Sequence, residues 1–152
     1  MGDWAGPPGL PLDEYVERAK CMRCVGGGHF ADDPEEMAKL LQASFCTIVK
    51  NSFRRWLKDV GACQRCGAVD NLQRSHRRDC SRPKLLREAI ERIGTRTDRG
   101  IAVNHRELRD AFLDLHKDDL HGRRLLCLCA SCHREYDRPP AVDLNAGGAA
   151  VP

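Results

Sequence analysis

The chain has 152 residues, a formal net charge of +3 and nine cysteines. This length predicts one compact domain with tails, not two full domains. No segment reaches the roughly 18–20 consecutive apolar residues of a membrane span, and the N-terminus lacks the basic and apolar regions of a signal peptide. An odd number of cysteines in C-x-x-C groups is typical of metal binding in a reducing compartment. We therefore expect an intracellular protein of the cytoplasm or nucleus.

The first part of the chain, residues 1–33, starts with a Gly/Pro-rich stretch and is expected to be a flexible N-terminal region. It contains a C-x2-C-x4-H sequence that resembles a retroviral-type CCHC zinc knuckle. The ligand positions are Cys21, Cys24 and His29. The fourth ligand of that motif falls on Pro34, so Cys46 would have to complete this second zinc site. The alternative is a chance resemblance in a glycine-rich loop, with Cys46 in a helix core.

Residues 34–60 are expected to form one long amphipathic helix. Asp33 can cap its start and Pro34 suits the first helical position, while Gly61 favours its termination. Apolar residues recur with a period near that of a helix, which predicts one buried face. That face contains Met37, Leu41, Phe45, Ile48 and Trp56.

Downstream, the pattern predicts two further helices, one strand and a final short helix: residues 83–93, 105–117, 123–128 and the segment from Ala130. Together with the long helix, these elements predict an α+β fold that is mostly helical. His105 and His116 would then be ordinary polar residues at the start and the end of one helix. A flexible tail is expected over residues 139–152.

Four cysteines form two C-x-x-C pairs: Cys63, Cys66, Cys129 and Cys132. Two thiolates three residues apart can bind one zinc ion, and two such pairs supply a complete tetrahedral site. The pairs are separated by 62 residues, so they would meet across an insertion that contains two predicted helices. We expect a structural zinc here; the alternative is a set of buried or redox-active thiols.

The order of the motifs around these cysteines resembles the zinc-containing HNH endonucleases. The resemblance covers about residues 61–138 and is carried by three segments: Cys63-x-x-Cys66-Gly, Leu72-Gln-Arg-Ser-His76 and Leu128-Cys129-x-x-Cys132-His133-x-x-x-Asp137. It implies a small treble-clef, ββα-metal zinc core, here with a helical insertion at residues 81–120. It also implies hydrolysis of phosphodiester bonds in nucleic acid.

Carried over position by position, the resemblance implies that His76 is the general base that activates water. His133 and Asp137 take the places of two ligands for a catalytic Mg²⁺ or Mn²⁺ ion. Ser75 stands where the family has a His or Asp ligand, and Arg124 stands where it has an asparagine. These two departures weaken the strand half of the implied metal site.

Positive charge is concentrated around these motifs. Residues 54–99 contain 13 basic and 6 acidic residues, a net charge of +7, although the whole chain carries only +3. Such a block attracts a phosphate backbone; a solvated helix surface is the plainer interpretation. The expected contacts to nucleic acid are Arg74, Arg77, Arg78, Arg82 and Lys84.

Three functional hypotheses follow from the sequence. The first is an HNH-like metal-dependent endonuclease that acts on nucleic acid, with DNA as the expected partner. The second is a non-catalytic zinc-binding module that binds nucleic acid on the same scaffold, favoured by Ser75 and the missing asparagine. The third is a protein-interaction module with a purely structural zinc and the long helix as its docking face. DNA versus RNA, site preference and oligomeric state stay open.

Overall fold

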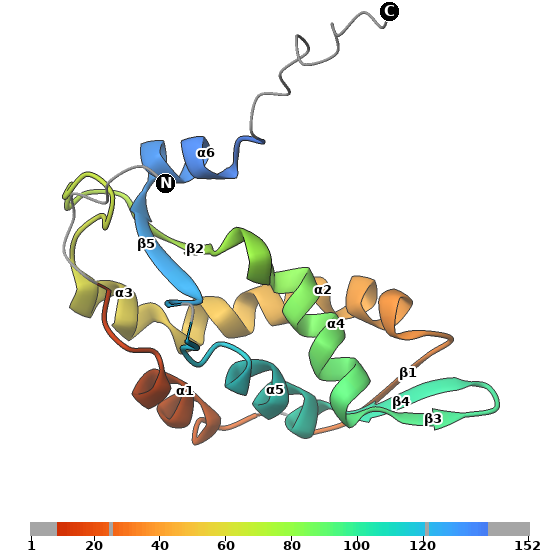
Figure 1. Ribbon diagram of the computed structural model, residues 1–152. Coiled ribbons are helices and arrows are strands. Elements are labelled where there is room, and N and C mark those ends of the chain that lie inside the picture. Colours follow the sequence, from red (N-terminus) through yellow and green to blue (C-terminus); the bar gives the residue numbers. More distant parts are fainter. Residues whose placement is uncertain (1–8, 25, 121, 140–152) are drawn as a thin grey trace, which may run out of the picture.

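A three-stranded sheet lies at one end of the molecule and a two-stranded sheet lies at the other, with helices between them (Figure 1). This computed structural model describes residues 9–24, 26–120 and 122–139. Residues 1–8 and 140–152, which include parts of both predicted flexible ends, lie outside this description. In chain order the elements are α1 (Asp13–Lys20), β1 (Gly28–Ala31), α2 (Pro34–Ser52), α3 (Arg54–Val60), β2 (Leu72–His76), the 3-10 helix η1 (Arg78–Cys80), α4 (Arg82–Ile93), β3 (Thr95–Thr97), β4 (Gly100–Asn104), α5 (His105–Asp114), β5 (Leu125–Cys129) and α6 (Ala130–Asp137).

These elements confirm the α+β class that the sequence predicts. The two sheets are small and helices make up most of the regular structure. In the part of the chain that the structure describes, no helix is long and apolar enough to cross a membrane.

The helix α2 begins where the sequence predicts. Asp33 Oδ1 accepts a hydrogen bond from the Glu36 backbone N–H at 2.8 Å, which satisfies one of the free donors at a helix start. The predicted single helix over residues 34–60 is interrupted, however, because Phe53 has a φ of −106° and a ψ of 18° between α2 and α3. Gly61 then ends α3 with a left-handed φ of 68°, which glycine adopts without steric strain.

The prediction of a flexible N-terminal region is wrong for the described part of residues 1–33. The helix α1 packs on the core, and Leu12 and Val16 are fully buried. The Trp56 indole N–H also donates to the Leu10 carbonyl at 2.9 Å. This helix was not predicted from the sequence because it is short and its few apolar residues are interspersed with charged ones. The helical periodicity of its apolar residues is therefore weak.

The insertion at residues 81–120 contains more than helices. A hairpin of β3 and β4 joins α4 to α5, and β4 also pairs antiparallel with β1 to give the strand order β1-β4-β3. Gly100 permits this arrangement, since its φ is +144° and an added Cβ would lie 2.2 Å from the Ala31 carbonyl oxygen. The hairpin was not predicted, because strands this short carry little alternation.

The second sheet connects two hydrophobic clusters. The larger cluster includes buried residues of α1, α2, α4 and α5, and the smaller one surrounds the C-x-x-C cysteines. The strands β2 and β5 pair antiparallel, with Leu72 opposite Cys129 and His76 opposite Leu125. The strand β2 therefore runs from the cysteines towards the larger cluster and has His76 at its far end.

Candidate metal centre and adjoining histidine cleft

The two C-x-x-C pairs meet at one point of the structure. Cys63 and Cys66 lie in the loop between α3 and β2, whereas Cys129 ends β5 and Cys132 lies in the first turn of α6. The four sulfur atoms lie within 4.8 Å of one another, and Cys66 Sγ is 3.7 Å from Cys129 Sγ. Tetrahedral zinc with Zn–S bonds of about 2.3 Å requires sulfurs about 3.8 Å apart, whereas a disulfide requires about 2.05 Å. The cluster is therefore a candidate metal site that is compatible with structural zinc.

Backbone groups support the thiolate form of Cys63. Gly67, with a φ of +77°, closes the first turn by donating its N–H to the Cys63 carbonyl at 2.8 Å. At the second pair, the Cys132 N–H lies 3.5 Å from Cys129 Sγ. Burial acts to raise the pKa of Cys63, but backbone N–H groups of its neighbours in the cluster lower that pKa to about 6. Such N–H donors stabilise the thiolate, which is the form that binds zinc.

A cleft of about 430 Å³ adjoins this cluster along α6. Its walls come from the second half of β2, the turn that leads into α4, and one side of α6 with the residues after it. Three residues with a predicted catalytic or metal-binding role line it: His76, His133 and Asp137. The structure thus brings together the three residues that the sequence motifs predict as a base and two helix ligands.

His133 and Asp137 present their side chains to each other one helical turn apart. His133 Nδ1 lies 2.7 Å from Gln73 Oε1, and His133 Nε2 lies 3.2 Å from Asp137 Oδ2. Because the amide oxygen of Gln73 only accepts, Nδ1 donates to it. The Asp137 carboxylate oxygen also only accepts, so its contact with Nε2 is favourable only when Nε2 is protonated or when a metal ion lies between the two atoms. A nitrogen and a carboxylate oxygen that face one point are ligands that Mn²⁺ or Mg²⁺ can use.

The strand half of the implied metal site is weak in the described residues. Ser75 is only 1% exposed, and its hydroxyl lies 3.5 Å from the carbonyl oxygen of His76. Arg124, at the position of the family's asparagine, forms an ion pair with Asp119 at 2.8 Å. A metal held by His133 and Asp137 would therefore take further ligands from water or phosphate oxygens.

His76 has a partner that sequence reasoning missed. Its Nε2 lies 3.1 Å from Nε2 of His116, a residue 40 positions further along the chain. Burial, together with the nearby His116 and Arg82, lowers the pKa of His76 to about 3. The ring is therefore neutral at pH 7 and has a lone pair available. No local sequence signal links the two histidines, because the pairing depends on tertiary packing that brings the segment after α5 next to the end of β2.

Four of the five predicted nucleic-acid contacts line the cleft: Arg74, Arg77, Arg78 and Arg82. Contacts within the protein hold at least two of them in place. Arg77 Nε donates to Asp79 Oδ1 at 2.6 Å, and the Arg78 guanidinium lies 4.9 Å from the centre of the Tyr136 ring. These contacts fix the two side chains on the cleft walls; the Asp79 carboxylate offsets the charge of Arg77, whereas the aromatic contact leaves the charge of Arg78 in place.

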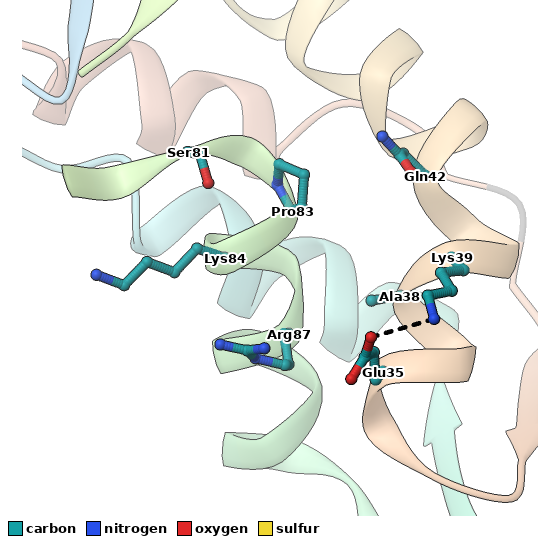
Figure 2. Close-up of a pocket in the computed structure, with 8 residues that line it drawn as sticks. All are labelled: Glu35, Ala38, Lys39, Gln42, Ser81, Pro83, Lys84 and Arg87. Atoms are coloured by element: carbon teal, nitrogen blue, oxygen red, sulfur yellow. Dashed lines mark ion pairs between the residues drawn. The ribbon is translucent and has the colours of Figure 1, made fainter. Parts of the chain in front are cut away.

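Lys84, the fifth predicted contact, lies outside the cleft. It lines a groove of about 430 Å³ between α2 and α4, and Figure 2 shows it on α4 across from the α2 residues. On the α2 side, Lys39 Nζ forms an ion pair with Glu35 at 3.1 Å. The groove and the cleft share two lining residues: Ser81 and Pro83. The two depressions therefore adjoin at the start of α4.

The structure does not bring together the ligands of the predicted second zinc site: Cys21, Cys24, His29 and Cys46. Within the described ranges, the four-cysteine cluster is the only group of three or more His, Cys, Asp or Glu ligands that meet within 4.8 Å. His29 Nε2 lies instead 2.8 Å from His105 Nδ1, and Cys46 Sγ lies 3.1 Å from a guanidinium nitrogen of Arg82. The strand that carries His29 pairs with β4, whereas Cys46 faces the start of α4.

Comparisons with known proteins leave the family open. No family model, curated protein or solved structure matches this chain. The grounds for a function are therefore the chemistry of the site and the order of the motifs that form it.

Proposed function

We propose that the chain is an HNH-like, metal-dependent endonuclease that hydrolyses phosphodiester bonds in nucleic acid, with DNA as the expected substrate. The observation that carries this proposal is the meeting of His76, His133 and Asp137 in one arginine-lined cleft. A base, metal ligands and positive charge are the groups that phosphodiester hydrolysis requires.

In this proposal the four cysteines hold a structural zinc ion within a treble-clef core. The ion would join the loop before β2 to the start of α6. Because β2 carries His76 and α6 carries His133, this cross-link would hold the base and the metal ligands at a constant separation. The role of zinc is thus to position the two walls of the cleft and not to take part in the reaction.

The residues of the cleft divide the chemistry among them. His133 and Asp137 would hold Mg²⁺ or Mn²⁺, and the bound ion would supply positive charge to the phosphate group. His76 accepts the proton of the attacking water. The arginine side chains of the walls bind the flanking phosphates through charge-assisted hydrogen bonds.

A second candidate is a non-catalytic module that binds nucleic acid through the same cleft. The buried Ser75 favours it, because a hydroxyl nearly removed from solvent cannot replace the His or Asp ligand of the family. The two candidates share the zinc site and the basic walls, so they differ only in whether the His133–Asp137 pair recruits a working metal.

The deciding experiment is cleavage of supercoiled plasmid DNA and of a structured RNA in Mg²⁺ or Mn²⁺ by zinc-loaded protein. We expect wild type to nick or cut, and His76→Ala to lose at least about a hundredfold in rate, since the general base is removed. His29→Ala is the matched control, because His29 lies outside the cleft and should retain wild-type activity.

The possible outcomes separate the two candidates. No cleavage by wild type in either metal, with binding that weakens as salt increases, would favour the non-catalytic module. Equal cleavage by wild type and His76→Ala would exclude His76 as the base. Cleavage of only one of the two nucleic acids would identify the substrate.

A further inference from the structure

His116 is a buried histidine held between two aromatic rings. It has no exposed surface, and its ring centre lies 4.7 Å from that of Phe112 and 5.3 Å from that of Phe53. The residue follows the end of α5, where its backbone N–H donates to the Leu113 carbonyl at 2.9 Å. The ring is thus fixed by packing, and the break between α2 and α3 at Phe53 supplies one of its walls.

Both ring nitrogens of His116 are in contact with hydrogen-bonding groups. Nδ1 lies 2.8 Å from the carbonyl oxygen of Phe112, and Nε2 lies 3.1 Å from Nε2 of His76. A carbonyl oxygen can only accept, so Nδ1 of His116 must carry a proton. Burial among aromatic rings disfavours a second proton on the ring, and it lowers the pKa of His116 to about 4. The Nε2 atom of His116 is therefore an acceptor.

The acceptor at His116 Nε2 determines which ring nitrogen of His76 carries the proton. With an acceptor at His116 Nε2, the contact is a hydrogen bond only if His76 donates from its own Nε2. The lone pair of His76 then lies on Nδ1. That atom has no hydrogen-bond partner among the described residues, and it is not among the fully buried unpaired polar atoms. It is therefore open to solvent on the cleft side, where His76 is a lining residue.

We propose that His116 is a positioning residue, which holds His76 in the Nε2–H tautomer and so directs the Nδ1 lone pair into the cleft. The chain of hydrogen bonds runs from the Phe112 carbonyl through His116 to His76. Its catalytic consequence rests on the proposed nuclease function, in which His76 Nδ1 accepts the proton of water. The tautomer itself does not depend on that function and can be measured separately.

The first test reads the tautomers directly. In ¹⁵N-labelled, zinc-loaded full-length protein, long-range ¹H–¹⁵N spectra of the imidazoles should show His76 as the Nε2–H tautomer and His116 as the Nδ1–H tautomer. A ¹⁵N–¹⁵N coupling between the two Nε2 atoms would demonstrate the hydrogen bond. A proton on Nδ1 of His76, or on Nε2 of a neutral His116, would overturn the proposal.

Two substitutions then separate positioning from packing. His116→Phe keeps an aromatic ring between the two phenylalanines but removes the acceptor, whereas the side-chain oxygen of His116→Gln can still accept from His76. We expect His116→Phe to give a mixed tautomer at His76 and a kcat about tenfold to hundredfold lower, with KM within about twofold. His116→Gln should restore the single tautomer and most of kcat.

The outcomes distinguish this inference from the nuclease assignment. An unchanged His76 tautomer and unchanged kcat in folded His116→Phe would overturn the positioning role while leaving the nuclease function intact. Should His116→Phe fail to fold, loss of both the single His76 tautomer and kcat in folded His116→Gln would overturn the stated order of donors. A locked tautomer in a wild-type protein that cleaves nothing would support the hydrogen-bond assignment and reject the nuclease function.

Discussion

Within the cleft, the hydrogen-bond partner of each histidine decides which ring nitrogen carries the proton. His133 donates from Nδ1 to Gln73, so its Nε2 is the ring nitrogen that faces the Asp137 carboxylate and can bind a metal ion when it carries no proton. His76 has the opposite arrangement, because its Nε2 is occupied by His116. The same residue type is therefore suited to bind a metal in one position and to accept a proton from water in the other.

The first residue-scale prediction concerns the metal ligands. Asp137→Asn should weaken Mn²⁺ binding at least about tenfold, because it removes the only carboxylate beside His133 Nε2 among the cleft-lining residues. Isothermal titration of zinc-loaded protein with MnCl₂ measures this affinity. Glu135→Gln is the matched control on the same helix, since Glu135 pairs with Arg65 and does not line the cleft. Equal affinities of all three proteins would remove Asp137 from the metal site.

At this scale, the sequence predicts the role of a residue when that role depends on its spacing from near neighbours in the chain. The four cysteines could be paired from sequence because each C-x-x-C supplies two ligands and tetrahedral zinc needs four. His133 and Asp137 are four residues apart, a spacing that places both on one face of a helix. His116 could not be found, because its role comes from a contact with His76 across 40 residues.

Among the elements, those with a strong periodic pattern or cap were predictable, and those held by tertiary contacts were not. The helix α2 combines an N-cap, a first-turn proline and a long apolar stripe. The helix α1 has only eight residues, too few for stability on its own. It depends on its contacts with α5, where Arg109 donates to the carbonyl oxygens of Lys20 and Met22, each at 2.8 Å.

Charge pairs also connect α1 to α5 and give the element-scale prediction. Asp114 accepts from Lys20 at 3.0 Å and lies 3.1 Å from Lys117. Partial burial acts to raise the pKa of Asp114, but the hydrogen bonds from the two lysines lower it below its ordinary value. Asp114→Asn should therefore reduce the free energy of unfolding by about 0.5–1 kcal/mol at pH 7.

The pH dependence of this difference in unfolding free energy follows from the direction of the Asp114 pKa shift. Because the folded-state pKa of Asp114 is depressed, its contribution is complete above the unfolded pKa of about 3.9 and disappears as the pH falls through the folded value. Urea unfolding of both proteins at pH 7, 5 and 3 measures the difference, with Glu88→Gln on α4 as a control for an exposed pair. A difference that persists at pH 3 would show that the carboxylate charge is not its cause.

At the scale of the whole molecule, the cleft lies where two hydrophobic clusters meet. The proposed base, His76, and its partner His116 lie on the side of the larger cluster, which has its own helical core. The proposed metal ligands, His133 and Asp137, lie on α6, beside the smaller cluster around the cysteines. The order of motifs in the sequence could indicate that His76 and the α6 residues come from different parts of the fold. Only the packing shows that β2 extends from one hydrophobic cluster to the other.

The last prediction concerns zinc removal, which should affect the smaller cluster more than the larger one. The smaller cluster has four buried residues, and three of them are cysteines of the candidate zinc site: Cys63, Cys129 and Cys132. Without the ion, these thiols lose the bonds that hold the loop before β2 against α6. Chelation should therefore increase amide hydrogen exchange in β5 and α6 far more than in α4 and α5, as mass spectrometry of peptides would show.

Two variants make this prediction specific. Cys63→Ser should reproduce the effect of the chelator, whereas Cys46→Ser should retain one zinc ion per chain, because Cys46 lies outside the cluster. A uniform increase over all helices would mean that the two clusters unfold as one unit, and no increase would mean that the cysteines hold no metal. If exchange rises only in the smaller cluster, loss of zinc moves His133 and Asp137 away from His76. Cleavage would then stop although the helical core stays folded.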